Sequence, residues 1–162
     1  MFDRETIELA TAVLEACRRH GWHVATAESC TGGLVVAALT AIAGSSDVVD
    51  RGFVTYSNEA KMELLGVPEA TLAAHGAISA ETALAMAQGA VARAGVDLAV
   101  SITGIAGPGG GSAEKPVGLV HFGVATKIGG HGERRVIPGD RTEIRRAAMV
   151  LALELLLAEA RR

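Results

Sequence analysis

The chain has 162 residues, an apolar fraction of 49% and a formal net charge of −3. This length suits a single domain over residues 1–162, and so much apolar content argues against disorder. The basic residues form no cluster, which argues against nucleic acid or an anionic membrane as a partner. We find neither a signal sequence nor an apolar run of about 18 residues, so we expect a cytoplasmic protein.

Helix and strand patterns alternate through the first half of the chain. In order, they predict a helix over 5–19, a strand over 22–27, a helix over 32–44, a strand over 50–57 and short helices over 58–66 and 69–76. Ser57 or Asn58 can cap the helix at 58–66. Either cap places Lys61 in the first turn of that helix.

The second half of the chain begins and ends with longer helices. In order, its patterns predict a helix over 79–95, a strand over 96–104, two hairpin strands over 117–126 and 133–139, and a last helix from Asp140. The strand at 96–104 is apolar almost throughout, which predicts the centre of a sheet covered on both faces. The whole order predicts an α/β fold, a three-layer α/β/α domain with a mixed, mostly parallel sheet.

Residues 27–33, AESCTGG, place three possible nucleophiles at a predicted strand-to-helix turn: Ser29, Cys30 and Thr31. A lone serine at such a turn is most simply a helix N-cap. The run of three before a glycine pair favours instead a nucleophile that faces helix-terminal N–H groups, which form a ready oxyanion hole. On its own the motif is a weak indication of chemistry.

A serine nucleophile needs a base, and the five histidines are scattered through the chain. Lys61 is a candidate because the positive end of the helix macrodipole and partial burial lower the pKa of an amine, and a neutral amine can accept a proton. The alternative is an exposed Lys61 that pairs with Glu59 or Glu63. Tyr56 ends the preceding strand at the same rim, where it can also serve only in packing.

Two further segments can hold an anion. Residues 103–118 contain six glycines after the predicted central strand, and they can cradle an anion with backbone N–H groups or form a flexible surface loop. The loop matches neither a Walker A motif nor a dinucleotide-binding fingerprint. Arg141, Arg145 and Arg146 lie near the start of the last helix, where cations are unfavourable unless a phosphate or an acidic group compensates. Simple solvation of these arginines is the alternative.

Seven segments of the chain form a pattern more specific than any one motif: AESCTGG, IAGSS, RGFVTYSNEAK, HGAIS, SITGIAGPGGGS, EKPVG and GDR. Taken together, they resemble the CinA C-terminal domain family over nearly the whole chain. Active members of that family are nicotinamide-nucleotide amidases, which convert nicotinamide mononucleotide to nicotinic acid mononucleotide and ammonia. The resemblance therefore implies a small-molecule nucleotide substrate, with no cofactor and no metal.

The resemblance also implies roles for individual residues. Ser29 would attack the carboxamide carbon, Lys61 would accept its proton, and Tyr56 would help to relay a proton to the departing ammonia. The residues implied in or around the substrate shell are Cys30, Thr31, Gly32, Ser46, Thr103, Gly104, Arg141 and Arg145. Arg141 would hold the phosphate, Cys30 would begin the helix after the motif, and Thr31 would cap that helix or join the ligand shell.

Other interpretations stay open at this point. Cys30 competes with Ser29 as the nucleophile. A non-catalytic pyridine-nucleotide-binding module would use the glycine-rich loop and the arginines equally well. A protein-interaction domain is a third class, suggested by a last helix that is apolar on nearly every side, although we expect that helix to complete the core or a homodimer interface.

Overall fold

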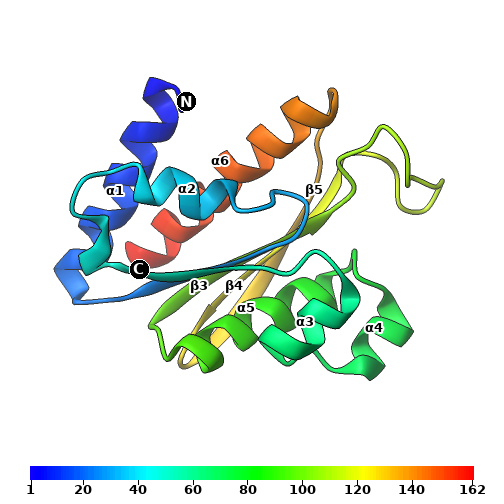
Figure 1. Cartoon of the computed structure of the whole chain (residues 1–162), viewed down its shortest axis with the longest axis horizontal. Coiled ribbons are helices and arrows are strands. Elements are labelled where there is room, and N and C mark those ends of the chain that lie inside the picture. The colour runs from blue at the N-terminus through cyan, green and yellow to red at the C-terminus, as the bar shows by residue number, and fades with distance from the viewer.

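The structure is a computed structural model that describes residues 1–162. Its centre is a five-stranded sheet in the order β2-β1-β3-β4-β5 (Figure 1). The strands are β1 (Val24–Glu28), β2 (Val49–Val54), β3 (Leu98–Gly104), β4 (Leu119–Thr126) and β5 (Gly129–Val136). The helices are α1 (Arg4–His20), α2 (Leu34–Thr40), the 3₁₀ helix η1 (Ser45–Asp47), α3 (Asn58–Leu65), α4 (Glu69–His75), α5 (Ala80–Ala94) and α6 (Arg141–Ala160).

Helices cover both faces of the sheet. Figure 1 shows α1, α2 and α6 on one side and α3, α4 and α5 on the other. Each side has its own apolar cluster, and β3 contributes side chains to both clusters. β3 lies in the middle of the sheet and is buried on both faces, which confirms its prediction as the central strand.

The sheet is mixed, but the prediction that it is mostly parallel is wrong. β1 runs parallel to β2 and to β3, whereas β3 with β4 and β4 with β5 form antiparallel pairs. The reason lies in the connections. A parallel neighbour needs a long crossover, usually a helix, and no helix lies between β3 and β4 or between β4 and β5.

Several helix ends follow from their local sequence. Gly21 ends α1 in the left-handed conformation, Ser79 caps α5, and Asp140 with Glu143 forms a complete capping box at the start of α6. The predicted start of the last helix at Asp140 is thereby confirmed. The predicted hairpin is also confirmed, although its turn is only residues 127–128, so most of the predicted connection belongs to β5.

Strands β1, β2 and β3 end at the same edge of the sheet. The Ser29 N–H donates to Ile102 O at 2.9 Å, and the Thr55 N–H donates to Glu28 O at 2.8 Å. The residues that follow these strands are therefore neighbours, and loops from the three strands converge there, as is usual for ligand sites in such sheets. No helix is both long enough and apolar enough to cross a membrane.

Candidate active site

Ser29 and Lys61 meet at this edge of the sheet. Ser29 follows β1 directly, and Lys61 is the fourth residue of α3. Ser57 caps α3 by accepting the Ala60 N–H at 3.0 Å, which fixes the first turn of the helix and hence the place of Lys61. Lys61 Nζ lies 3.2 Å from Ser29 Oγ, within hydrogen-bonding distance. The fold thus brings together a hydroxyl and an amine that are 32 positions apart in the sequence.

The Lys61 amine is buried and has no counter-ion. Its side chain is only 1% exposed, and it takes part in no ion pair. Its other hydrogen-bond partners are neutral carbonyls, Thr55 O at 2.8 Å and Tyr56 O at 3.4 Å. Burial lowers the pKa of Lys61 below its ordinary value, because water no longer solvates the charged form. The alternative of an exposed Lys61 paired with Glu59 or Glu63 is therefore wrong.

Glu28 organises the turn that carries Ser29, and sequence reasoning missed it. The Glu28 side chain is fully buried. It accepts five hydrogen bonds of 2.7–3.1 Å, which come from the hydroxyls of Thr26 and Thr31 and from the N–H groups of Gly33, Val35 and Val36. A carboxylate at the N-terminus of α2 also faces the positive end of the helix macrodipole. The signal in the sequence was an acid that directly follows the predicted strand at 22–27.

One expectation about this turn is wrong, and one of the two alternatives for Thr31 is excluded. α2 begins at Leu34, so Cys30 does not begin the helix, and Thr31 does not cap it because its hydroxyl donates to Glu28. Gly32 and Gly33 have φ values of 60° and 101°, a conformation that glycine adopts readily, and they keep Cys30 and Thr31 in the turn before the helix.

Glu28 also accepts hydrogen bonds from N–H groups at the start of α2, so those groups are not a free oxyanion hole. The N–H groups of Cys30 and Thr31 have no acceptor in the protein.

Cys30 is poorly suited to be the nucleophile. Its side chain is 6% exposed, and burial raises the pKa of the thiol to about 11. A thiolate is the reactive form of cysteine, and little of it exists at neutral pH when the pKa is this high. The geometry therefore favours Ser29 over its competitor.

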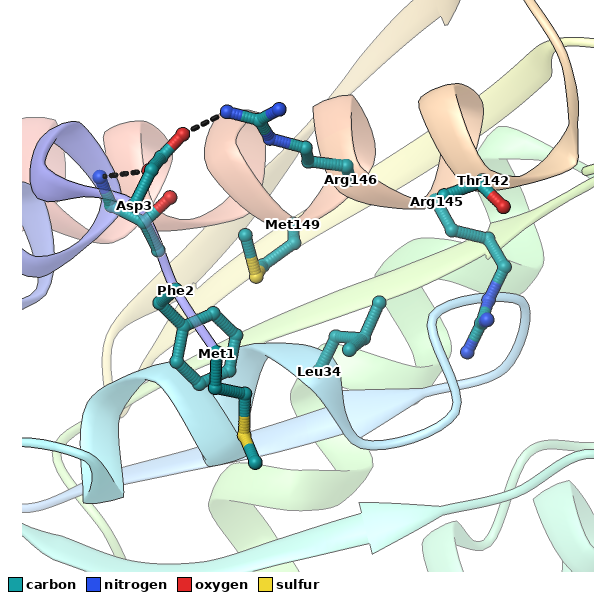
Figure 2. Close-up of a pocket in the computed structure, with 9 residues that line it drawn as sticks. Met1, Phe2, Asp3, Leu34, Thr142, Arg145, Arg146 and Met149 are labelled. Carbon is teal, nitrogen blue, oxygen red and sulfur yellow. Dashed lines mark hydrogen bonds and ion pairs between the residues drawn. The ribbon is translucent and has the colours of Figure 1, made fainter.

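Arg145 holds the same turn from the side of α6. Its Nε donates to Cys30 O at 3.0 Å, and its Nη2 donates to Thr31 O at 3.1 Å. Figure 2 shows Arg145 reaching from α6 toward the loop before α2, beside a cavity of about 330 Å³. Gly32 lies close by, since a Cβ at Gly32 would be 3.4 Å from Arg145 Nη2. Two of the three guanidinium nitrogens of Arg145 thus position the turn.

Tyr56 and Arg141 lie together at the rim. The Tyr56 side chain is 63% exposed, and its hydroxyl accepts a hydrogen bond from Arg141 Nη2 at 3.3 Å. Arg141 Nη1 donates to Gly107 O at 2.8 Å, in the glycine-rich loop. Only the main-chain oxygen of Tyr56 contacts Lys61. The phenol therefore faces the outer part of the site, next to a guanidinium that can take an anion.

The remaining predicted residues lie at opposite ends of the parallel strands. Thr103 and Gly104 end β3 beside the Ser29 turn, and the Thr103 hydroxyl donates to Ala77 O at 2.8 Å. Ser46 is exposed in η1, which precedes β2 and therefore lies at the opposite edge. Within one chain, the structure does not bring Ser46 to Ser29.

Comparison with known proteins places this arrangement in a family. The family model for the CinA C-terminal domain matches residues 6–160. The chain belongs to the CinA C-terminal domain family. The resemblance seen in the sequence motifs is thereby confirmed.

Relatives within the CinA C-terminal domain family match the chain at full length. Nicotinamide-nucleotide amidohydrolase PncC of Escherichia coli is 53% identical over 157 residues, which cover 96% of this chain and 95% of the relative. The protein of the same name from Enterobacter agglomerans is 51% identical over 160 residues and 98% of both chains. The crystal structure of competence/damage inducible protein CihA from Agrobacterium tumefaciens superposes with a TM-score of 0.95 at 52% identity, covering 100% of this chain and 99% of that chain.

Proposed function

We propose that this chain hydrolyses the carboxamide of nicotinamide mononucleotide, which gives nicotinic acid mononucleotide and ammonia. The observation that carries the proposal is the 3.2 Å contact between Ser29 Oγ and a buried, unpaired Lys61 amine. The names of the full-length relatives support the same substrate class. A buried lysine without a counter-ion is costly for stability, and a module that only binds nucleotides has no use for one.

The contacts of Lys61 suit a neutral amine that acts as general base. A neutral amine has two N–H bonds and one lone pair. The carbonyls of Thr55 and Tyr56 can accept the two N–H bonds, which leaves the lone pair for the Ser29 hydroxyl proton. Lys61 takes that proton while Ser29 Oγ bonds to the carboxamide carbon.

The rest of the first half-reaction uses the Ser29 turn. The unpaired N–H groups of Cys30 and Thr31 stabilise the oxyanion that forms on the carboxamide oxygen. The carbon–nitrogen bond then breaks, and the nitrogen receives the proton that Lys61 took from Ser29. The Tyr56 phenol does not contact Lys61, so it can help this transfer only through a water molecule at the rim. Ammonia leaves, and Ser29 carries the nicotinoyl group as an ester.

Water completes the cycle. Lys61, neutral again, accepts a proton from a water molecule as that water attacks the ester carbon. The ester bond to Ser29 Oγ breaks, the proton returns to the serine oxygen, and the product leaves as a carboxylic acid.

The substrate would lie between this turn and the rim. Arg141 takes the phosphate, and the end of β3 at Thr103 and Gly104 lines the path between the reactive carbon and that arginine. Ser46 lies at the other edge of the sheet, so it can reach a substrate only from a second copy of the chain. We therefore include a homodimer in the proposal.

Ammonia release from nicotinamide mononucleotide tests the proposal. We expect Ser29→Ala to lower turnover by at least about 10³-fold, as loss of a nucleophile does in other serine hydrolases, and Cys30→Ala to retain activity. An inactive Cys30→Ala together with an active Ser29→Ala would overturn the assignment of the nucleophile. Binding of the nucleotide in a thermal-shift assay without any ammonia would favour the non-catalytic alternative. Turnover of free nicotinamide in place of the nucleotide would remove the role of Arg141.

A further inference from the structure

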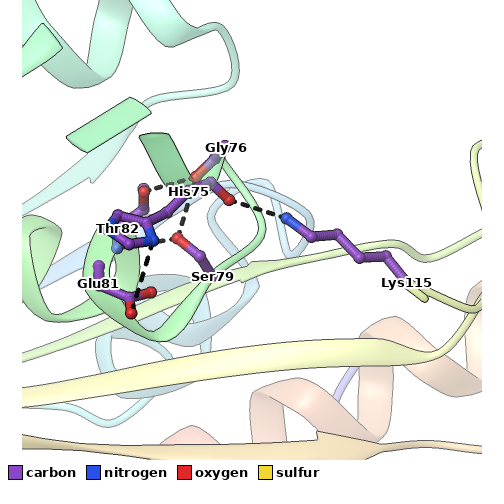
Figure 3. A network of polar contacts seen from close by, with 6 residues as sticks. All are labelled: His75, Gly76, Ser79, Glu81, Thr82 and Lys115. Carbon is purple, nitrogen blue, oxygen red and sulfur yellow. Dashed lines mark hydrogen bonds and ion pairs between the residues drawn. The ribbon is translucent and has the colours of Figure 1, made fainter. Parts of the chain in front are cut away.

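A second polar cavity lies over β4, on the face of the sheet that α4 and α5 cover. Its volume is about 440 Å³, and its charged or titratable lining residues are His75, Glu81, Glu114, Lys115, His121 and Arg134. Two sequence motifs that have no part in the Ser29 chemistry meet here, residues 75–79 (HGAIS) and 114–118 (EKPVG). Lys115 Nζ joins them by donating to His75 O at 2.9 Å (Figure 3).

His121 in this cavity has a buried ring nitrogen that makes no hydrogen bond, which does not stabilise the fold. It is 8% exposed, and its Nδ1 is shielded from solvent and has no hydrogen-bond partner. In the sheet it lies directly opposite Thr103 on β3 and Arg134 on β5. Directly opposed side chains point to the same face, so the imidazole faces the α5 side, where it lines the cavity. Buried polar groups are nearly always paired, so a buried imidazole left unpaired points to a missing partner.

Two basic side chains of the cavity make no direct contact with a carboxylate, although Glu81 and Glu114 also line it. Lys115 and Arg134 take part in no ion pair. The contact with His75 O uses only one of the three donors of Lys115. Burial, followed by the charges of Arg134 and Lys115, lowers the pKa of His121, and the smaller influence of Glu81 opposes them. An anion that offsets these two cations would raise the pKa of His121 again.

The N-terminus of α5 adds backbone donors. Ser79 caps the helix, and its hydroxyl also donates to Gly76 O at 3.0 Å, which fixes the turn before the helix (Figure 3). The N–H groups of Ala80 and Glu81 have no acceptor in the protein. A helix N-terminus with free N–H groups favours anions, and phosphate in particular.

We propose that this cavity binds the phosphate group of a phosphate monoester, at a place separate from Arg141. Lys115 and Arg134 supply the charge, the first N–H groups of α5 supply directed hydrogen bonds, and His121 becomes protonated as the phosphate enters. The volume leaves room for an organic group beside the phosphate. The carboxylates of Glu81 and Glu114 line the same cavity, so they disfavour polyphosphates. This proposal does not depend on the chemistry of Ser29.

Nuclear magnetic resonance of the His121 ring, with inorganic phosphate as the probe and chloride at equal ionic strength as reference, tests the proposal. We expect phosphate to raise the pKa of His121 by about one unit, which corresponds to about tenfold tighter binding when His121 is protonated. Lys115→Met and Arg134→Gln should each reduce this shift. Lys127→Met is the matched control and should retain it, because Lys127 pairs with Asp97 away from the cavity.

A second set of measurements separates the two sites. Arg141→Gln should leave the phosphate-dependent shift of His121 unchanged, and a shift lost in that variant would overturn the proposal. So would a His121 pKa that does not respond to phosphate in the wild type, or one that responds equally in Lys115→Met and Arg134→Gln. Steady-state kinetics then identify the source of the phosphate. A raised KM of Lys115→Met for nicotinamide mononucleotide assigns the cavity to the substrate, and an unchanged KM assigns it to a separate phosphate ester.

Discussion

Replacing Glu28 with glutamine tests how the Ser29 turn is built. In the wild type, one carboxylate oxygen accepts from Thr31, Gly33 and Val35, and the other accepts from Thr26 and Val36. Glutamine has nearly the same shape but only one acceptor oxygen. If that oxygen takes the side with three donors, the new amide nitrogen faces the Val36 N–H, and two donors oppose each other in a buried place.

The hydrogen bonds of Glu28 determine how much stability Glu28→Gln should lose. A buried donor left unsatisfied costs about 1–3 kcal/mol, and the hydrogen bonds that remain lose the strengthening given by a charged acceptor. We therefore expect Glu28→Gln to lower the free energy of unfolding by about 2–4 kcal/mol. Because the same contacts hold the turn that carries Ser29, a displacement of about 1 Å should lower kcat by about 10²-fold.

Urea denaturation and ammonia release measure the two effects. Glu63→Gln is the matched control, because Glu63 is exposed on α3, and it should change the free energy of unfolding by less than about 0.5 kcal/mol. If Glu28→Gln unfolds at the same urea concentration as the control and keeps full activity, the carboxylate does not organise the turn.

Three further perturbations have defined outcomes. Because burial lowers the pKa of Lys61 below its ordinary 10.5, the unfolded chain binds this proton more readily between the lowered pKa and 10.5, so the wild type should gain stability over Lys61→Met as the pH rises through that range. Denaturation at a series of pH values measures the difference, and a constant difference contradicts it. Arg145→Gln should lower kcat with little change in KM, and Arg141→Gln should raise KM for nicotinamide mononucleotide; the reverse pattern would exchange their roles. Leu151→Glu tests whether α6 forms the interface of the proposed dimer, since Leu151 is half-buried beside the core; loss of the dimer in light scattering with the fold intact supports that interface, unfolding contradicts it, and a monomeric wild type refutes the dimer.

The sequence alone predicts helix starts and buried strands, because these depend on residues only a few positions apart. Ser57 predicts the start of α3, and that start alone puts Lys61 in a first turn. The apolar run at residues 98–104 predicts a strand buried on both faces, which is the central strand. Asp140 predicts the start of α6 in the same way, since its side chain acts on a backbone only a few residues away.

Features that depend on distant partners could not be predicted in this way. The direction of β4 follows from a connection without a helix, which the mostly parallel prediction overlooked. In the sequence, Glu28 is only one letter of the AESCTGG motif. Its role as a hydrogen-bond acceptor follows from the fold, which places the N-terminus of α2 over the end of β1. Arg145 lies 115 positions from Cys30, so its hydrogen bond to the Ser29 turn likewise could not be predicted from the local sequence.

The titration of the Lys61 amine by nuclear magnetic resonance examines the central claim most directly. The chain has only three lysines, so a spectrum of Lys61→Met assigns the signal without ambiguity. We predict that Lys61 loses its proton below 10.5, the ordinary pKa of a lysine amine. An amine that stays charged up to that value would leave Ser29 without a base, and the proposed mechanism would be wrong.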